Sequence, residues 1–153
     1  MSEDAQPGRP PFVSVIIPVY NDLAHLRKLL GSLANQAYGG ENFEVIVVDN
    51  GSDEDISGII NEFGVSLLYE NNVQSSYAAR NKGVDAAKGK VFAFIDSDCV
   101  ADKSWVEEGV KGLEQTGISL VGGRVVFAFS AKKRAAEYYD AVSNFQFAEK
   151  IKR

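Results

Sequence analysis

The stretch "VFAFIDSDCV" (91–100) decides how the fold is predicted. A short, mostly apolar run from Val91 to Ile95 leads directly into two carboxylates, Asp96 and Asp98, which a single serine separates. An apolar run of this length is typical of a buried strand. We therefore expect a buried strand that ends on an acidic pair.

The rest of the chain alternates between strand-like and helix-like segments. Besides the strand at 90–100, strands are predicted over 12–20, 43–52 and 65–70, and helices over 21–36, 52–64, 75–89 and 102–117. Short connections between alternating elements predict an α/β fold, a three-layer α/β/α sandwich around a mostly parallel sheet. The segment 118–129 is strand-like with a Gly-Gly interruption, and 131–153 has a helical pattern.

Two end signals refine these elements. Pro18 is expected to end the first strand, because proline cannot donate to a ladder. Asn21 or Asp22 is expected to cap the following helix. The apolar face of that helix is predicted from leucines at helical spacing, namely Leu23, Leu26, Leu29, Leu30 and Leu33.

Composition narrows the class of protein. The 153 residues suffice for one domain with a sizeable core. The 16 basic and 21 acidic residues give a net charge of −5, which argues against a nucleic-acid partner. The single cysteine, Cys99, favours a reduced, cytoplasmic setting. Residues 1–11 have acidic residues and prolines where a signal peptide would be basic and then apolar, so we interpret them as a disordered lead-in.

Polar residues follow three of the predicted strands: Tyr20, Asp49, and the pair Asp96 and Asp98. Ligands of open parallel sheets bind beyond the carboxyl ends of the strands, so these residues predict a site. Two carboxylates on one side of an extended segment repel each other, and Mg²⁺ or Mn²⁺ would remove that repulsion. The alternative is a solvated turn in which one aspartate caps the next helix.

Other candidates each have two interpretations. Asp49 could accept a hydrogen bond from a base or sugar, or it could begin a turn. Tyr20 could stack on a base or cover the sheet edge. Arg80 could reach a diphosphate or lie on a solvated helix face. His25 is interpreted as a surface residue, and Cys99 as a packing residue.

Three separated blocks carry a resemblance to a known family. They are "VSVIIPVYND" (13–22), "FEVIVVDNGSDED" (43–55) and "YAARNKGVDAAKGKVFAFIDSDCV" (77–100). In order and spacing they resemble the family 2 glycosyltransferases of the GT-A fold, over about residues 12 to 126. The resemblance is to the N-terminal, donor-binding portion of that family.

The resemblance implies a role for each matching residue. Pro18, Val19 and Tyr20 would line the nucleotide base, and Asp49 would bind it. The other matching residues would act at the diphosphate, ribose and metal, with Arg80 near the diphosphate, Asp96 facing ribose and metal, and Asp98 binding a divalent cation, Mn²⁺ or Mg²⁺.

The family chemistry is inverting transfer of a sugar from a nucleotide-diphosphate donor to an acceptor hydroxyl. The acceptor would be a carbohydrate or a lipid-linked molecule, and the catalytic base is expected beyond Arg153. We therefore expect a lead-in at 1–11, a nucleotide-sugar-binding core at 12–130, and a helix at 131–153 that leads to a missing acceptor region. The chain alone would then be the metal- and nucleotide-binding half.

The predicted C-terminal helix has aromatic residues at near-helical spacing, namely Tyr138, Tyr139, Phe145 and Phe147. They would be buried against the missing region or support an oligomer. A cytoplasmic location is expected, and the basic end "KIKR" (150–153) allows contact with the inner face of a membrane.

Three other functions are alternatives to a glycosyltransferase. A non-catalytic nucleotide-binding or interaction domain with the same fold is the main alternative, since no base is evident. A nucleotidyltransferase would need a glycine-rich signature after the first strand, and "PVYNDLAHL" (18–26) lacks one. A phospho-accepting signalling domain would place its acidic pair after the first strand, and not after the fourth.

Overall fold

The computed structural model of the protein describes residues 9–115 and 117–126. The elements follow one another as β1 (Val13–Val19), α1 (Leu23–Leu33), a 3₁₀ turn η1 (Gly40–Asn42), β2 (Phe43–Asp49), α2 (Ser57–Phe63), β3 (Ser66–Tyr69), α3 (Ser76–Ala86), β4 (Val91–Phe94) and α4 (Trp105–Leu113). The predicted helix over 131–153, with its aromatic residues, and residues 1–8 of the lead-in lie outside the described residues.

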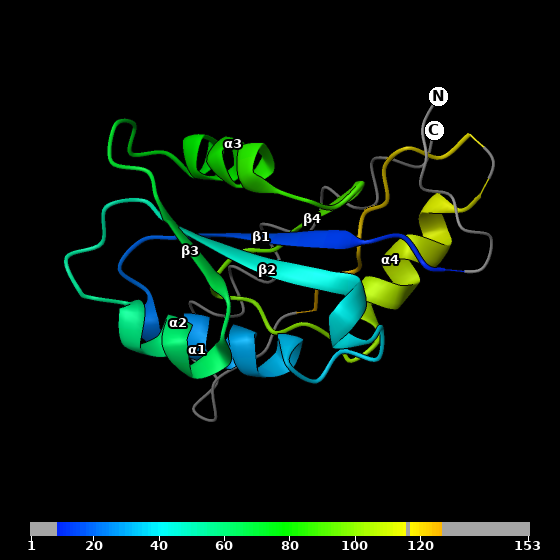
Figure 1. The fold of residues 1–153 in the computed structure, drawn as a ribbon, viewed down its shortest axis with the longest axis horizontal. Coiled ribbons are helices and arrows are strands. Elements are labelled where there is room, and N and C mark those ends of the chain that lie inside the picture. Colours follow the sequence, from blue (N-terminus) through cyan, green and yellow to red (C-terminus); the bar gives the residue numbers. More distant parts are fainter. Residues whose placement is uncertain (1–8, 116, 127–153) are drawn as a thin grey trace. The chain divides into compact units, whose positions relative to one another are not determined.

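The four described strands form one parallel sheet in the order β3-β2-β1-β4. Val13 is in register with Phe43 of β2 and with Val91 of β4. Helices α1 and α2 cover one face of this sheet and α3 covers the other (Figure 1). The predicted three-layer α/β/α arrangement with a parallel sheet is therefore confirmed.

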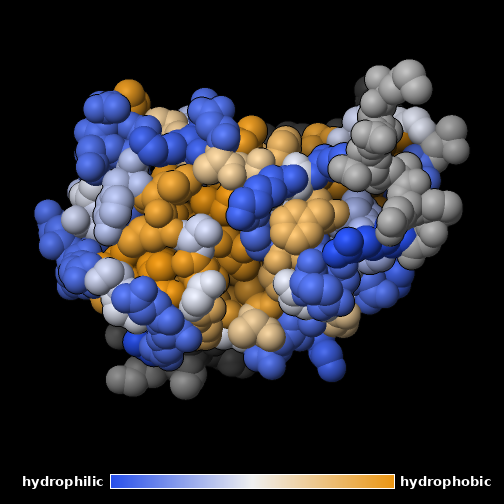
Figure 2. Space-filling view, in the orientation of Figure 1, coloured by the Kyte–Doolittle hydropathy of each residue, from blue (hydrophilic) through white to orange (hydrophobic). Residues whose placement is uncertain are grey.

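The larger core lies between the sheet and α1, α2 and α4. Its fully buried side chains come from alternate positions of β1 and from the leucines of α1, and include Val13, Val15, Ile17, Val19, Leu26, Leu29, Leu30 and Leu33. The leucine face predicted for the first helix is thus confirmed. Apolar side chains also gather over the strands in the middle of the face seen in Figure 2, with polar side chains above and below.

The opposite face of the sheet carries a smaller core under α3. It contains Ile46, Val48 and Ala79. Ser75 is the N-cap of helix α3, and its hydroxyl accepts the N–H groups of Tyr77 and Ala78 at 3.2 and 3.3 Å. Because both faces are covered, every residue of β1 and of the C-terminal part of β2 is buried.

The prediction that the fourth strand is fully buried is wrong. Among the described residues β4 lies at the edge of the sheet, with β1 as its one neighbour. Phe92 and Phe94 are 43% and 47% exposed, whereas Val91 and Ala93 pack against the larger core. Burial of an apolar strand depends on what covers each face, which its own sequence does not determine.

The strand predicted over 118–129 is not found in its described part, 118–126. Leu120 and Val126 are 89% and 70% exposed. A strand-like composition means that side chains suit a half-buried pleated surface, so it produces a strand only where such a surface exists.

Pro18 lies inside β1 and is buried, so the prediction that it ends the strand is also wrong. It pairs in register with Val48 of β2. Its ring nitrogen faces the β4 side, where the ladder has already ended with the Ile95 N–H donated to the Ile16 carbonyl at 3.3 Å. The missing N–H therefore breaks no hydrogen bond of the sheet.

In the part of the chain that the structure describes, we find no helix both long and apolar enough for a membrane span.

Helix α3 approaches β1 closely at Gly83. A β-carbon added there would overlap the side chain of Ile16 and would lie 3.4 Å from Val48 Cγ2. Glycine at this position is what allows the helix to lie close to the sheet, and so brings the first turns of α3 toward the strand ends.

We predict that Gly83→Ala lowers the free energy of unfolding by about 1–3 kcal/mol, because the added methyl group overpacks this contact. Chemical denaturation measures the change. Gly31→Ala is the matched control, since a β-carbon there meets nothing within 4 Å. It should raise stability by about 0.5–1 kcal/mol through helix propensity. Equal effects of the two substitutions would contradict the packing argument.

Candidate functional site

A polar pocket of about 340 Å³ opens beyond the carboxyl ends of β1, β2 and β4. Its lining comes from the end of β1, the loops after β1, β2 and β4, and the first turns of α3. It consists of Pro18, Val19, Tyr20, Asp22, Asn50, Ser76, Arg80, Asp96, Ser97 and Asp98. The expected convergence of strand ends is therefore present. Of the seven residues predicted for the site, all except Asp49 line this pocket.

The loop after β1 is held to the loop after β2 by Asn21. Its side chain donates to Asp53 Oδ2 at 3.0 Å and accepts the Asp53 N–H at 2.8 Å. Its own N–H donates to Ser52 Oγ at 2.9 Å. Asn21 has φ +48°, a left-handed conformation that asparagine tolerates better than most residues. The three hydrogen bonds stabilise this turn and direct Tyr20, which is half exposed, to the pocket.

The loop after β2 is held in turn to the loop after β3 by Asn50. This side chain is 5% exposed and donates to the carbonyls of Glu70 and Val73, both at 2.9 Å. Its N–H donates to the Val19 carbonyl at 2.9 Å. Because all these groups are paired, the pocket wall between β1 and α3 is tied into one network.

Asp49 lies behind this wall. It is 4% exposed, and Oδ1 accepts the Ser52 N–H at 3.0 Å, as expected of an aspartate that begins a turn. The turn interpretation of Asp49 is therefore present in the structure. Its predicted role in binding a base remains a prediction.

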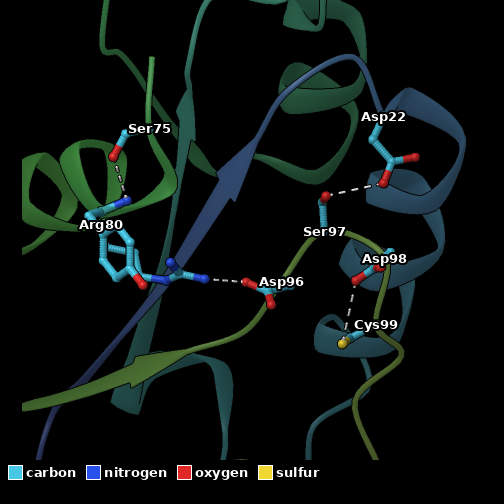
Figure 3. A network of polar contacts seen from close by, with 8 residues as sticks. Asp22, Ser75, Arg80, Asp96, Ser97, Asp98 and Cys99 are labelled. Carbon is cyan, nitrogen blue, oxygen red and sulfur yellow. Dashed lines mark hydrogen bonds and ion pairs between the residues drawn. The ribbon is translucent and has the colours of Figure 1, made fainter. Parts of the chain in front are cut away.

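Asp96 and Asp98 lie on a turn closed by the Cys99 N–H, which donates to the Asp96 carbonyl at 3.1 Å. Both acids are exposed, while Ser97 between them is half-buried. Arg80 of α3 reaches across the pocket and pairs with Asp96, as Figure 3 shows. Within the described residues Asp98 forms no ion pair, and the Cys99 thiol makes a weak hydrogen bond to its Oδ1 at 3.8 Å.

Cys99 lies on this turn, and the pKa of its thiol is raised. Burial raises the pKa of its thiol, and the negative charges of Asp98 and Asp96 raise that pKa further. The thiol is therefore protonated near neutral pH, and thiolate chemistry is disfavoured here. This agrees with the interpretation of Cys99 as a packing residue.

Several pocket residues are not among those predicted from the sequence. Asp22, Asn50, Ser76 and Ser97 line the pocket, and Asn21 supports it. Asn21, Asp22 and Asn50 directly follow apolar strands, so the rule that singled out Tyr20 and Asp49 could have found them. Ser76 could not be found in this way, because it lies at the start of a helix.

Asp22 differs from its sequence prediction in an informative way, whereas His25 does not. Asp22 occupies the N-cap position of α1, but its side chain caps no backbone N–H. Its carboxylate instead contacts His25 Nδ1 at 2.6 Å and accepts the Ser97 hydroxyl at 3.2 Å. The expected surface position of His25 is confirmed, since its side chain is 53% exposed.

A second cavity, of about 290 Å³, lies at the other ends of the strands, between α1, α2 and the starts of β2 and β3. Its lining is mostly apolar, with Glu44 as its one charged side chain. The polar pocket is the better candidate site because it alone of these two gathers several charged groups.

Comparison with known proteins shows the family of this chain. The family model described as "Glycosyl transferase family 2" matches residues 14–152. The chain belongs to glycosyl transferase family 2.

Relatives and solved structures of this family agree with that assignment. The chain is 42% identical over 146 residues to the glycosyltransferase AglE of Haloferax volcanii, covering 92% of the chain and 48% of AglE. It superposes with TM-score 0.60 and 27% identity on S. aureus TarS 1–349 in complex with UDP-GlcNAc, covering 76% of the chain and 37% of TarS 1–349.

A third match shows the GT-A fold alone, because identity is low. The mannosyltransferase PcManGT of Pyrobaculum calidifontis, in complex with GDP-Man and Mn²⁺, superposes with TM-score 0.67 at 23% identity. It covers 72% of the chain and 34% of PcManGT. The family 2 chain described here thus spans less than half the length of each of these three proteins.

In this family 2 domain the loop after β3, which Asn50 holds, contains Glu70, a carboxylate with a lowered pKa. The N–H groups of Asn72 and then Val73 lower the pKa of Glu70 below 4.5, with a smaller effect from Lys82. Lys82 Nζ lies 3.6 Å from Glu70 Oε2, so Lys82 points to Glu70 and does not line the pocket.

We predict that this loop is stabilised by ionised Glu70 above pH 4.5 and loses that stabilisation as pH falls through the lower pKa of the folded state. Free energies of unfolding, measured by denaturation between about pH 6 and pH 3, should fall less steeply for Glu70→Gln than for the wild type. Glu54→Gln, which changes an exposed carboxylate in another loop, is the control. Parallel pH curves for all three proteins would contradict the assignment.

Proposed function

We propose that this domain binds the diphosphate of a nucleotide sugar together with a divalent cation, as the donor site of an inverting glycosyltransferase. The observation that carries the proposal is the convergence of Tyr20, Arg80, Asp96 and Asp98 on one pocket at the strand ends. An aromatic ring, a guanidinium group and two carboxylates are the groups that a base, a diphosphate and a hard cation require.

The residues that would hold the cation are Asp96 and Asp98. Both are exposed oxygen donors on one turn, and no cluster of three or more metal-ligating side chains occurs among residues 9–115 and 117–126. This donor set fits Mg²⁺ or Mn²⁺, which use one or two carboxylates and complete their coordination with phosphate and water. When bound, such a cation would neutralise negative charge on the departing diphosphate.

Arg80 would bind the diphosphate. Its present partner is Asp96, and the side chains of Arg80 and Asp96 are 25% and 60% exposed. Because water screens the Asp96 side of this pair, a diphosphate, which carries more negative charge than one carboxylate, can replace Asp96 as the partner of Arg80. The exchange would leave Asp96 free for the ribose and the cation.

The base of the nucleotide would lie near Tyr20, with Pro18 and Val19 beneath it. Tyr20 is 50% exposed and can offer a ring face. Asp49 would accept a hydrogen bond from the base. One of its oxygens already accepts the Ser52 N–H, so the other is the more available acceptor for the base. The UDP-GlcNAc and GDP-Man complexes of the two structural neighbours make uridine and guanosine diphosphates the nucleotides to test first.

The remaining parts of the reaction rest on the family resemblance. The acceptor would be a carbohydrate or a lipid-linked molecule, and the base that takes the proton of its hydroxyl is proposed to lie beyond Arg153. A cytoplasmic location, with contact at the inner face of a membrane, belongs to the same proposal. The role of the 131–153 segment in an oligomer is likewise proposed.

We predict that UDP or GDP binds the purified chain with Mn²⁺ present and that Asp98→Ala weakens this binding about tenfold or more, because a cation ligand is lost. Isothermal titration calorimetry with and without Mn²⁺ measures the effect. Asp85→Ala removes an exposed carboxylate from α3 outside the pocket and should bind as the wild type does. Binding that is independent of Mn²⁺ and unchanged in Asp98→Ala would refute the metal role.

A further inference from the structure

The segment that follows β4 runs along helix α1 and is hydrogen-bonded to it. Ser32 Oγ accepts the Ala101 N–H at 3.0 Å. Gln36 donates to the Asp102 carbonyl at 2.6 Å and accepts the Val106 N–H at 3.1 Å. These contacts fix the part of the segment that comes after the acidic pair, near the C-terminal end of α1.

The acidic pair itself is reached by one side chain of the α1 region, Asp22. Its Oδ2 accepts the hydroxyl of Ser97 at 3.2 Å, and Ser97 is the residue between Asp96 and Asp98 (Figure 3). The other carboxylate oxygen of Asp22 contacts His25 Nδ1 at 2.6 Å. Both oxygens of Asp22 are therefore engaged, and its side chain is 25% exposed.

The position of Asp22 makes this arrangement informative. An aspartate at the N-cap normally accepts a backbone N–H of the first helical turn, which stabilises a helix by about 1 kcal/mol. Asp22 makes no such bond and directs its carboxylate to Ser97, 75 residues further along the chain. The local contact is replaced by a tertiary one that ends at the proposed cation ligands.

We propose that Asp22 is a positioning residue, which holds the Asp96–Asp98 turn through Ser97 in the geometry that binds the cation. This inference rests on the proposed function. Ser97 is half-buried and its two neighbours are exposed, so holding Ser97 inward keeps both carboxylates directed outward. Asp22 acts through Ser97 and not as a ligand, because in the described ranges no three acidic, histidine or cysteine side chains are grouped closely enough to hold a metal.

A measurement without ligand tests the contact itself. Hydrogen–deuterium exchange of the peptide 95–101 should be about fivefold faster in Ser97→Ala than in the wild type, since one hydrogen bond to a carboxylate is lost. Ser97→Thr keeps a hydroxyl and should restore the slow rate. Ser57→Ala is the matched control, because Ser57 donates to Asp55 Oδ2 at 2.9 Å outside the pocket. Wild-type exchange rates in Ser97→Ala would overturn the proposal.

A second measurement tests the consequence for the cation. With UDP or GDP present, the Kd of Mn²⁺ should rise about tenfold in Ser97→Ala and in Asp22→Ala, while Ser97→Thr and Ser57→Ala bind as the wild type does. The double variant Ser97→Ala/Asp22→Ala should be no weaker than Asp22→Ala alone, because both substitutions remove the same contact. Additive losses, or wild-type affinity in Ser97→Ala, would overturn the positioning role.

The two proposals fail in different ways. If the wild type binds neither nucleotide with Mn²⁺, the proposed function fails, and unchanged exchange in Ser97→Ala would separately remove the Asp22 contact. If the wild type binds and Asp98→Ala does not, the function stands, and the Ser97 and Asp22 variants alone decide the inference.

Discussion

The ladder between β1 and β4 ends at Ile16, two residues before Pro18, and the site depends on this ending. Ile16 makes the last bond by accepting the Ile95 N–H. The next residue of β1 that faces β4 is Pro18, which would pair with Asp96 if the register continued, and it has no N–H to donate. The chain after β4 is therefore free to turn away from the sheet and expose its carboxylates.

Beyond the end of the ladder, hydrogen bonds of side chains hold the loops together. Asn21 and Asp22 follow β1, which lies between β2 and β4, and each reaches the loop of one neighbour, Asn21 that of β2 and Asp22 that of β4. Asn50 extends the same network to the loop after β3. A pocket lined by three loops and α3, and supported by the loop after β3, is in this way arranged before any ligand arrives, which lowers the entropic cost of binding.

The carboxylates of the pocket differ in how fully they are engaged. Asp22 uses both oxygens in contacts within the protein, Asp96 shares one with Arg80, and Asp98 has only the weak thiol contact among the described residues. Asp98 is thus the acid most available to a cation. Burial, and then the negative charges of Asp98 and Asp96, raise the pKa of Cys99; a bound cation would neutralise those charges.

Local sequence patterns predicted the alternation of strands and helices, the parallel sheet and the leucine face of α1. They also predicted the sheet edge at which Tyr20, Asp96 and Asp98 gather. These follow from local periodicity and from the rule that parallel strands deliver their carboxyl ends to one edge. Three short blocks of sequence also indicated the family resemblance. The family match over residues 14–152 confirmed this resemblance.

Other features of the fold and of the site depend on how the elements pack together. The sequence pattern predicted that Pro18 ends a strand and that Asn21 or Asp22 caps α1. Local rules do not say which neighbouring strand a residue faces or which distant side chain it contacts, so they could not predict the observed positions. The exposure of Phe92 and Phe94 likewise depends on what lies against the edge strand. Burial, register and long-range hydrogen bonds are properties of packed elements, so no single segment of the sequence contains them.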